Sequence, residues 1–160
     1  MTERDRIRDQ LEQIFAGPAW HGPSLREALA GVTADQAAAR PLGRAHRIWE
    51  IVLHLASWKR IVRRRLAGES VGVDDTDELD WPRVGATNDA TWREALAALD
   101  AAQRELLDAV GSLDEGRLGD LLGQQPVSGH STVYVQLHGL AHHDSYHAGQ
   151  IMLLRRCAGW

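Results

Sequence analysis

The sequence GLAHHDSYHAGQIMLLRR, at residues 139–156, has the spacing of a long amphipathic helix. Its apolar residues recur at three- and four-residue steps, which places them on one buried stripe. Upstream, Ser131 or Thr132 can cap the helix N-terminus, and the two arginines of the final turn favour the negative end of the helix dipole. The pattern therefore predicts a helix that runs from this cap to Arg156.

The same periodicity marks three earlier segments, at residues 2–15, 46–67 and 89–110. Glycine follows the first two segments, and Asn88 can cap the third. Shorter helical turns are expected at residues 23–29, 33–39 and 114–122. Because residues 69–88 make the second connection too long for a tight turn, the sequence predicts an all-α four-helix bundle with long connections.

Length, charge and cysteine content limit the functional classes. The 160 residues match the usual size of one domain, so we expect a single domain over residues 1–160. The net charge of -4 and the short basic clusters argue against a nucleic-acid partner. No apolar run approaches the roughly 20 residues that cross a bilayer, so no membrane association is expected. Cys157 is the only cysteine, which excludes an intrachain disulfide and favours a cytoplasmic location.

Four of the eight histidines lie in the last predicted helix. Residues four apart lie on one face of a helix, so His138 pairs with His142, and His143 pairs with His147. The second pair shares its face with the aliphatic residues that should point into the bundle. His143 and His147 are therefore the better candidates for metal ligands.

A metal ion needs further ligands from another segment, and His54 can supply one. It lies in the middle of the second long helix, on a face with Ile51 and Ile61 that should be buried. Three neutral imidazoles would leave at least one coordination position open, as in catalytic zinc sites, and zinc, nickel, cobalt and iron all accept such ligands. From spacing alone, histidines that are solvated or hydrogen-bonded without a metal remain an alternative. A zinc protease is not expected, because Asp144 stands where the H-E-x-x-H helix carries its glutamate base.

Two of these segments resemble the DinB/YfiT-like superfamily. Residues 139–156 resemble the closing helix of that family, which has a pattern close to H-x-x-x-H-x-G-Q-I, and residues 46–66, HRIWEIVLHLASWKRIVRRRL, are similar to its second helix. The likeness extends over most of the chain, including the acidic loop around Trp81. The resemblance implies a helical bundle, frequently a homodimer, that holds one divalent metal ion through three histidines. The implied ligands are His54, His143 and His147.

Several polar residues near the expected site have both a functional and a structural interpretation. Glu50, four residues before His54, could orient a ligand or accept a proton from metal-bound water, or it could pair with an arginine on the rim. Gln136 and Gln150 could hydrogen-bond a ligand or the substrate, or satisfy backbone groups. Tyr146 could present its hydroxyl near the metal, or it could pack against neighbours. Glu50, Tyr146 and Gln150 are the candidate catalytic residues.

The resemblance also suggests a reaction. Relatives in the superfamily include transferases and an isomerase that use low-molecular-weight thiols such as mycothiol or bacillithiol. We therefore expect a metal-dependent transferase that activates such a thiol for S-transfer to a small electrophile, so that its partners are a small-molecule thiol and an electrophilic substrate. The alternatives are a metal-dependent hydrolase and a non-catalytic metal-binding module that acts in stress response or dimerisation.

Overall fold

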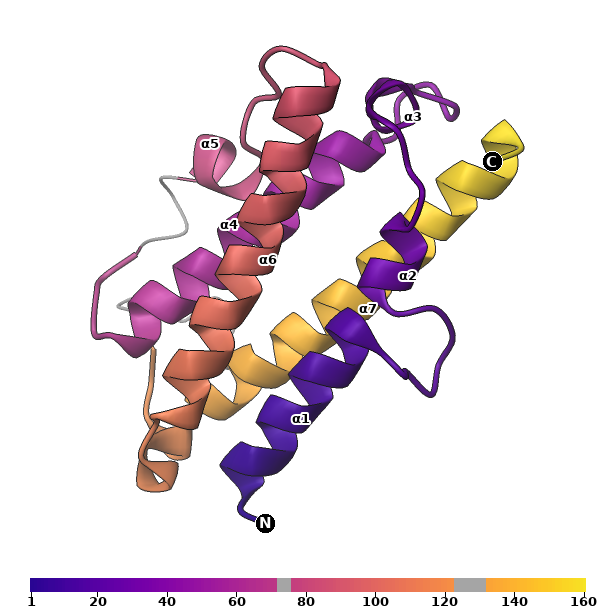
Figure 1. Ribbon diagram of the computed structural model, residues 1–160. Helices are drawn as coiled ribbons and strands as arrows, with labels where there is room; N and C mark the ends of the chain where they lie inside the picture. The colour runs from indigo at the N-terminus through magenta and orange to yellow at the C-terminus, as the bar shows by residue number, and fades with distance from the viewer. Residues whose placement is uncertain (72–75, 123–131) are drawn as a thin grey trace.

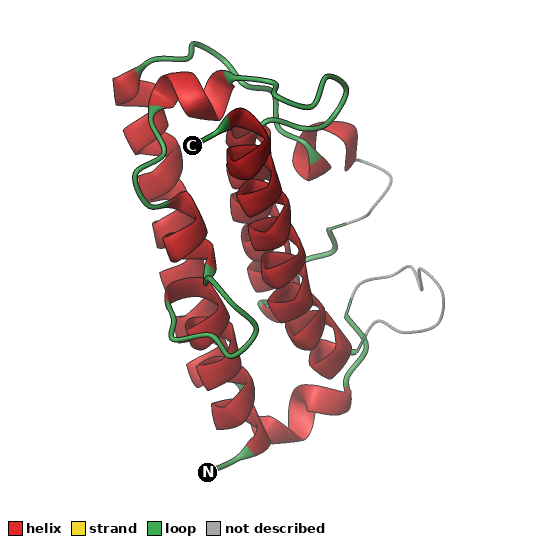
Figure 2. Ribbon diagram, turned by 90° about the vertical axis from the view of Figure 1, so that its right-hand side faces the viewer, coloured by secondary structure: helices red, strands yellow, loops and turns green. Residues whose placement is uncertain are grey.

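The computed structural model describes residues 1–71, 76–122 and 132–160 of the chain. Its four long helices are α1 (Glu3–Ala16), α4 (Ile48–Leu66), α6 (Asp89–Gly111) and α7 (Val133–Ala158). The short elements are α2 (Leu25–Leu29), α3 (Ala34–Ala38), α5 (Thr76–Asp80) and the 3₁₀ helix η1 (Glu115–Gly119). Among the described residues there are helices and loops but no strand, and the all-α prediction is confirmed (Figure 2).

The long helices form a four-helix bundle in which α1 and α7 run in one direction and α4 and α6 run in the other (Figure 1). The rings of Trp49 and Trp92 lie 5.1 Å apart near the starts of α4 and α6, so these two helices begin at the same end. Arg65, at the end of α4, donates a hydrogen bond to Gln136, at the start of α7, so these two helices are antiparallel. The long second connection is what returns the chain to the common end of α4 and α6.

Local sequence accounts for most helix boundaries. Thr2 and Asp5 form a capping box on α1. At the start of α6, the Asn88 side chain accepts hydrogen bonds from the backbone N–H groups of Ala90 and Thr91. Thr132 caps α7, and the alternative cap, Ser131, lies outside the described residues. Most observed boundaries differ from the predicted ones by one to three residues. For example, α4 begins at residue 48 instead of 46, the 114–122 turn is a 3₁₀ helix at 115–119, and α7 continues two residues beyond 156.

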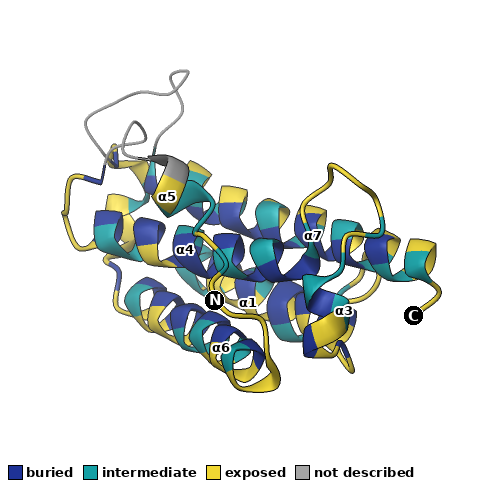
Figure 3. Ribbon diagram, turned by 90° about the horizontal axis from the view of Figure 1, so that it is seen from above, coloured by how far each residue is buried: buried dark blue, intermediate teal, exposed yellow. Residues whose placement is uncertain are grey.

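The buried side chains form two apolar clusters, one above the other along the bundle, and the exposed residues face outward (Figure 3). The α2-side cluster includes Leu25, Ile48, Val52, Leu55, Leu99 and Ile151. The η1-side cluster includes Ile7, Leu11, Leu66, Leu106, Leu137 and Leu140. Within the described segments, no helix is both long and apolar enough to cross a bilayer.

Candidate metal centre

The three predicted ligands meet between α4 and α7. The Nε2 atom of His54 lies 2.8 Å from Nε2 of His143, which lies 3.1 Å from Nε2 of His147. One ring nitrogen from each residue lies within 4.8 Å of the others. Nitrogens that share a tetrahedral zinc ion, at about 2.0–2.1 Å from it, are about 3.3 Å apart, so the donor set fits a divalent ion after a small adjustment.

Hydrogen bonds at the opposite ring nitrogens orient two of the imidazoles. Nδ1 of His54 lies 2.6 Å from the carbonyl oxygen of Asp80, which can only accept a hydrogen bond. Nδ1 of His147 lies 2.6 Å from Oε1 of Gln150. In both rings the Nδ1 atom therefore carries the proton, and the lone pair of Nε2 faces the other two histidines, as a metal ligand requires.

The segment that includes the end of α5 is fastened to α4 beside this cluster. Ser57 donates a hydrogen bond to the carbonyl of Leu79, and the Trp58 indole N–H donates to Oδ1 of Asp80 at 2.6 Å. These contacts hold the Asp80 carbonyl against His54. The site is therefore assembled from three elements, α4, α5 and α7.

Trp81 covers one face of a candidate ligand. Its indole stacks on the His54 ring at a centroid distance of 3.9 Å and an angle of 8°. The His46 ring stacks on the indole at 3.6 Å and 4°. Trp81 is thus sandwiched between a surface histidine and a buried one, and the stack restricts rotation of His54 about its side-chain bonds.

Burial favours the neutral form of all three imidazoles. His54 and His147 are each 4% exposed, and His143 is half-buried. Desolvation, with the neighbouring imidazoles and Lys59 adding to it, lowers the pKa of His143 to about 3. Desolvation and the nearby His54 lower the pKa of His147 to about 4. Burial also lowers the pKa of His54, although Asp80 opposes the shift. Neutral imidazole is the form that binds a metal ion, so the cluster is ready to bind one near pH 7.

A family comparison supports the same interpretation. The sequence model of the DinB superfamily matches residues 19–151. The chain belongs to the DinB superfamily. The matched range contains all three histidines of the cluster, and it extends over most of the bundle. No curated protein matches the chain.

The other site residues predicted for this DinB-superfamily protein have different surroundings. The Glu50 carboxylate pairs with Arg40, with Nδ1 of His46 at 3.2 Å and with Nε of Arg47 at 3.2 Å. Burial raises its pKa, but the Arg47 N–H, His46 and the two arginines outweigh that effect and lower it. Glu50 is therefore a paired carboxylate on the rim, and its contact with the site passes through the stacked ring of His46.

Tyr146, Gln150 and Gln136 differ in their relation to the cluster. Tyr146 is 64% exposed, and its ring centroid lies 5.1 Å from that of His147. Gln150 contacts His147 directly, as described above. Gln136 instead accepts a hydrogen bond from Arg65 and donates one to the Leu122 carbonyl, so it lies with the end of α4 and away from the histidines. The catalytic roles of Glu50, Tyr146 and Gln150 stay predictions.

Sequence reasoning did not find the contacts that orient His54. The acceptor is a backbone carbonyl, which no residue type marks, and His46 had no expected role. Trp81, directly after Asp80, could have indicated that this connection packs against α4, because an aromatic ring in a polar connection often packs against the element beside it. Of the two histidine pairs of α7, the structure places His143 and His147 in the cluster with His54, and the cluster does not include His138 or His142.

Proposed function

We propose that this protein binds one divalent metal ion through His54, His143 and His147. The observation that carries the proposal is the convergence of three Nε2 atoms from two antiparallel helices, with the Nδ1 atoms of two rings already hydrogen-bonded. A random group of buried histidines has no reason to turn the same nitrogen of each ring toward one point. Zinc, nickel, cobalt and iron all accept three neutral imidazoles, and at least one coordination position stays open to a small molecule.

The function we propose is transfer of a low-molecular-weight thiol, of the mycothiol or bacillithiol type, to a small electrophile. When bound, the ion supplies Lewis acidity, which makes a thiol or a water molecule nucleophilic near neutral pH. Membership of the superfamily supports the reaction class. The exposed Tyr146 beside His147 provides a hydroxyl that can donate a hydrogen bond to the incoming thiol or electrophile.

Two further residues have roles in this proposal. Gln150 holds the Nδ1–H of His147, so that Nε2 stays turned to the centre. Glu50 holds His46, which in turn supports Trp81 on the His54 ring. Glu50 thereby acts on the geometry of the site, and a solvent molecule takes the thiol proton.

The first experiment is elemental analysis of protein purified without a histidine tag, compared with a His54→Ala variant. A stoichiometric divalent metal that is lost in the variant is the expected result. The metal-loaded protein is then incubated with mycothiol, bacillithiol or glutathione and a chromogenic electrophile. Turnover should be lost in His147→Ala and retained in His138→Ala, which removes a histidine of the same helix that lies outside the cluster. Equal turnover in both variants would contradict the proposal.

The same measurements separate the alternatives. A metal-dependent hydrolase would cleave chromogenic esters or amides without added thiol. A non-catalytic module in stress response or dimerisation would give no turnover with either class of substrate, while the metal would still raise the melting temperature. Absence of stoichiometric metal in the wild-type protein would remove all three interpretations.

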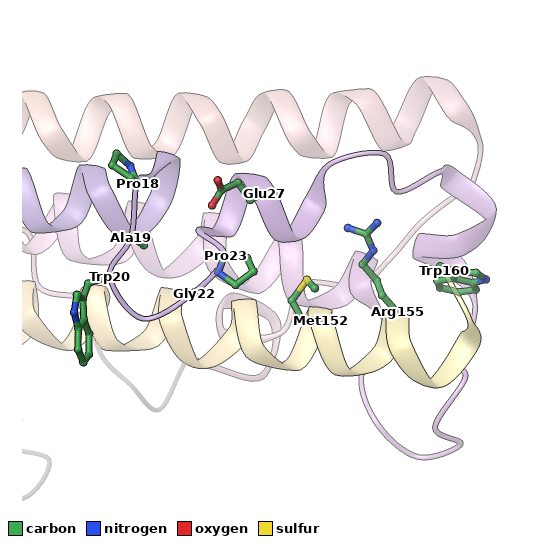
Figure 4. Close-up of a pocket in the computed structure, with 9 residues that line it drawn as sticks. All are labelled: Pro18, Ala19, Trp20, Gly22, Pro23, Glu27, Met152, Arg155 and Trp160. Carbon is green, nitrogen blue, oxygen red and sulfur yellow. The ribbon is translucent and has the colours of Figure 1, made fainter.

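We also propose that the protein is a homodimer and that it acts in the cytoplasm. The outer face of α7 carries exposed apolar side chains, among them Val135 and Leu153, which are 39% and 53% exposed. Beside it, the loop between α1 and α2 and the end of α7 border an open groove of about 590 Å³ (Figure 4). The groove is lined by Pro18, Ala19, Trp20, Gly22, Pro23, Glu27, Met152, Arg155 and Trp160. Exposed apolar surface of this kind favours self-association.

Sedimentation velocity should give a dimer for the wild type and a monomer for Leu153→Arg. A monomeric wild type would refute the proposed dimer.

A further inference from the structure

The chain contains a single lysine, and that lysine is fully buried. All other basic positions of the 18 Lys and Arg residues are arginine. Lys59 of α4 and Asp144 of α7 are both 0% exposed, and Nζ of the lysine lies 2.5 Å from Oδ2 of the aspartate. The ammonium group also lies 5.3 Å from the centroid of the Phe15 ring of α1. An ion pair so far from water calls for a physical explanation, because desolvating two charges costs several kcal/mol for each.

The ion pair lies at the boundary between the two apolar clusters. On α4, the α2-side cluster ends at Ala56 and the η1-side cluster begins at Val62. On α7, the two clusters are separated by the residues between Ala141 and Ala148. Gln103 of α6 is 2% exposed and donates a hydrogen bond to the Leu11 carbonyl of α1. On α6 it lies between Ala102 of the α2-side cluster and Leu106 of the η1-side cluster. A thin polar layer therefore crosses the middle of the bundle, between the two apolar clusters.

This layer is next to the histidine cluster on both helices. Lys59 is five residues after His54, and Asp144 directly follows His143. Above and below this layer, the apolar side chains of α4 and α7 are mostly Leu, Ile, Val and Ala. They could be repacked with α7 displaced along α4, since such interchangeable side chains specify register only weakly. A displacement of one helical turn, about 5.4 Å, would separate the two charges and leave both of them buried without a partner.

We propose that the Lys59–Asp144 pair is a positioning pair that holds α7 against α4 in the one register that brings His143 and His147 to His54. This inference rests on the proposed metal site. Ligand positions must be correct to within about 0.2 Å for tight binding, which packing of aliphatic side chains does not guarantee. The pair is thus kept for the geometry of the site, and its removal should affect the metal more than the fold.

The test replaces both charges by apolar side chains of similar size, in Lys59→Met/Asp144→Leu. Such a replacement is often neutral or stabilising, so the variant should melt at or above the temperature of the wild type. Titration with Co²⁺ should show a dissociation constant raised at least tenfold and a changed visible absorption band. The band reports coordination geometry, which a pair with only a stabilising role would not alter. The matched control is Gln103→Leu, which removes a buried polar group of the same layer from a helix without ligands and should leave the constant and the band unchanged.

The outcomes separate this inference from the proposed function. A wild-type protein that does not bind Co²⁺ would overturn the metal site and the positioning pair together. A wild type that binds, with a double variant of equal affinity and identical band, would overturn the positioning pair alone. If the double variant does not fold, Asp144→Asn answers the same question, because it keeps the volume and removes one of the two charges that penalise every other register. Weaker Co²⁺ binding is then expected, and an unchanged constant and band would refute the inference.

Discussion

Stability of the metal-free protein should fall as the pH drops below about 6.5. Histidine in an unfolded chain has a pKa of about 6.5, whereas the fold lowers the pKa of His143 to about 3 and that of His147 to about 4. Both rings stay neutral in the folded protein at pH 5, but the unfolded chain takes up a proton at each. The contribution of the two rings to the free energy of unfolding is therefore fully present above pH 6.5. It is lost progressively as the pH falls toward 4.

The size of the loss follows from these pKa values. Between pH 7 and pH 5, proton uptake by the unfolded chain costs roughly 2 kcal/mol for each ring and roughly 4 kcal/mol for the two. That is a large part of the 5–15 kcal/mol by which a typical domain is stable, so the effect should be easy to measure. Urea unfolding of the chelator-treated protein, followed by far-UV circular dichroism at pH 7 and pH 5, provides the measurement.

The decisive comparison is between two double variants of the same helix. His143→Ala/His147→Ala should lose roughly 4 kcal/mol of the pH-dependent change, because the rings responsible are gone. His138→Ala/His142→Ala removes two histidines outside the cluster and should keep it. If both double variants have the same difference in unfolding free energy between pH 5 and pH 7, the burial argument for the cluster is wrong.

Three other predictions concern the core and the surroundings of the site. An N-hydroxysuccinimide ester should acylate the exposed Met1 amine of the native protein rapidly and the buried Lys59 only after unfolding, which peptide mass spectrometry would detect; equal native rates would contradict the burial of the lysine. Trp81→Ala removes the ring stacked on His54 and should weaken Co²⁺ binding about 10- to 100-fold while Trp81→Phe largely preserves it, as isothermal titration would show. Leu106→Ala, at a fully buried position, should cost about 2–5 kcal/mol in urea unfolding without changing the metal stoichiometry, and a smaller loss would mean that the core closes around the cavity.

The sequence alone determined the helices and selected the three histidines that meet in the cluster. Apolar spacing, caps and glycine stops are local, because they depend on residues within about two turns of one another, and they gave helix ends within two residues for α6 and α7. The same local geometry selected His143 and His147 over the neighbouring pair, and the apolar face of α4 selected His54.

Tertiary structure decided which groups meet across elements. The sequence left open whether Glu50 would serve the metal or an arginine, and the packing of the 40–47 segment paired it with two arginines and a histidine. It gave no sign that the Asp80 carbonyl would orient His54, or that the single lysine would pair with Asp144. These contacts depend on the register and crossing of helices far apart in the chain, and that arrangement results from many small packing energies summed over the whole core, which no local pattern records.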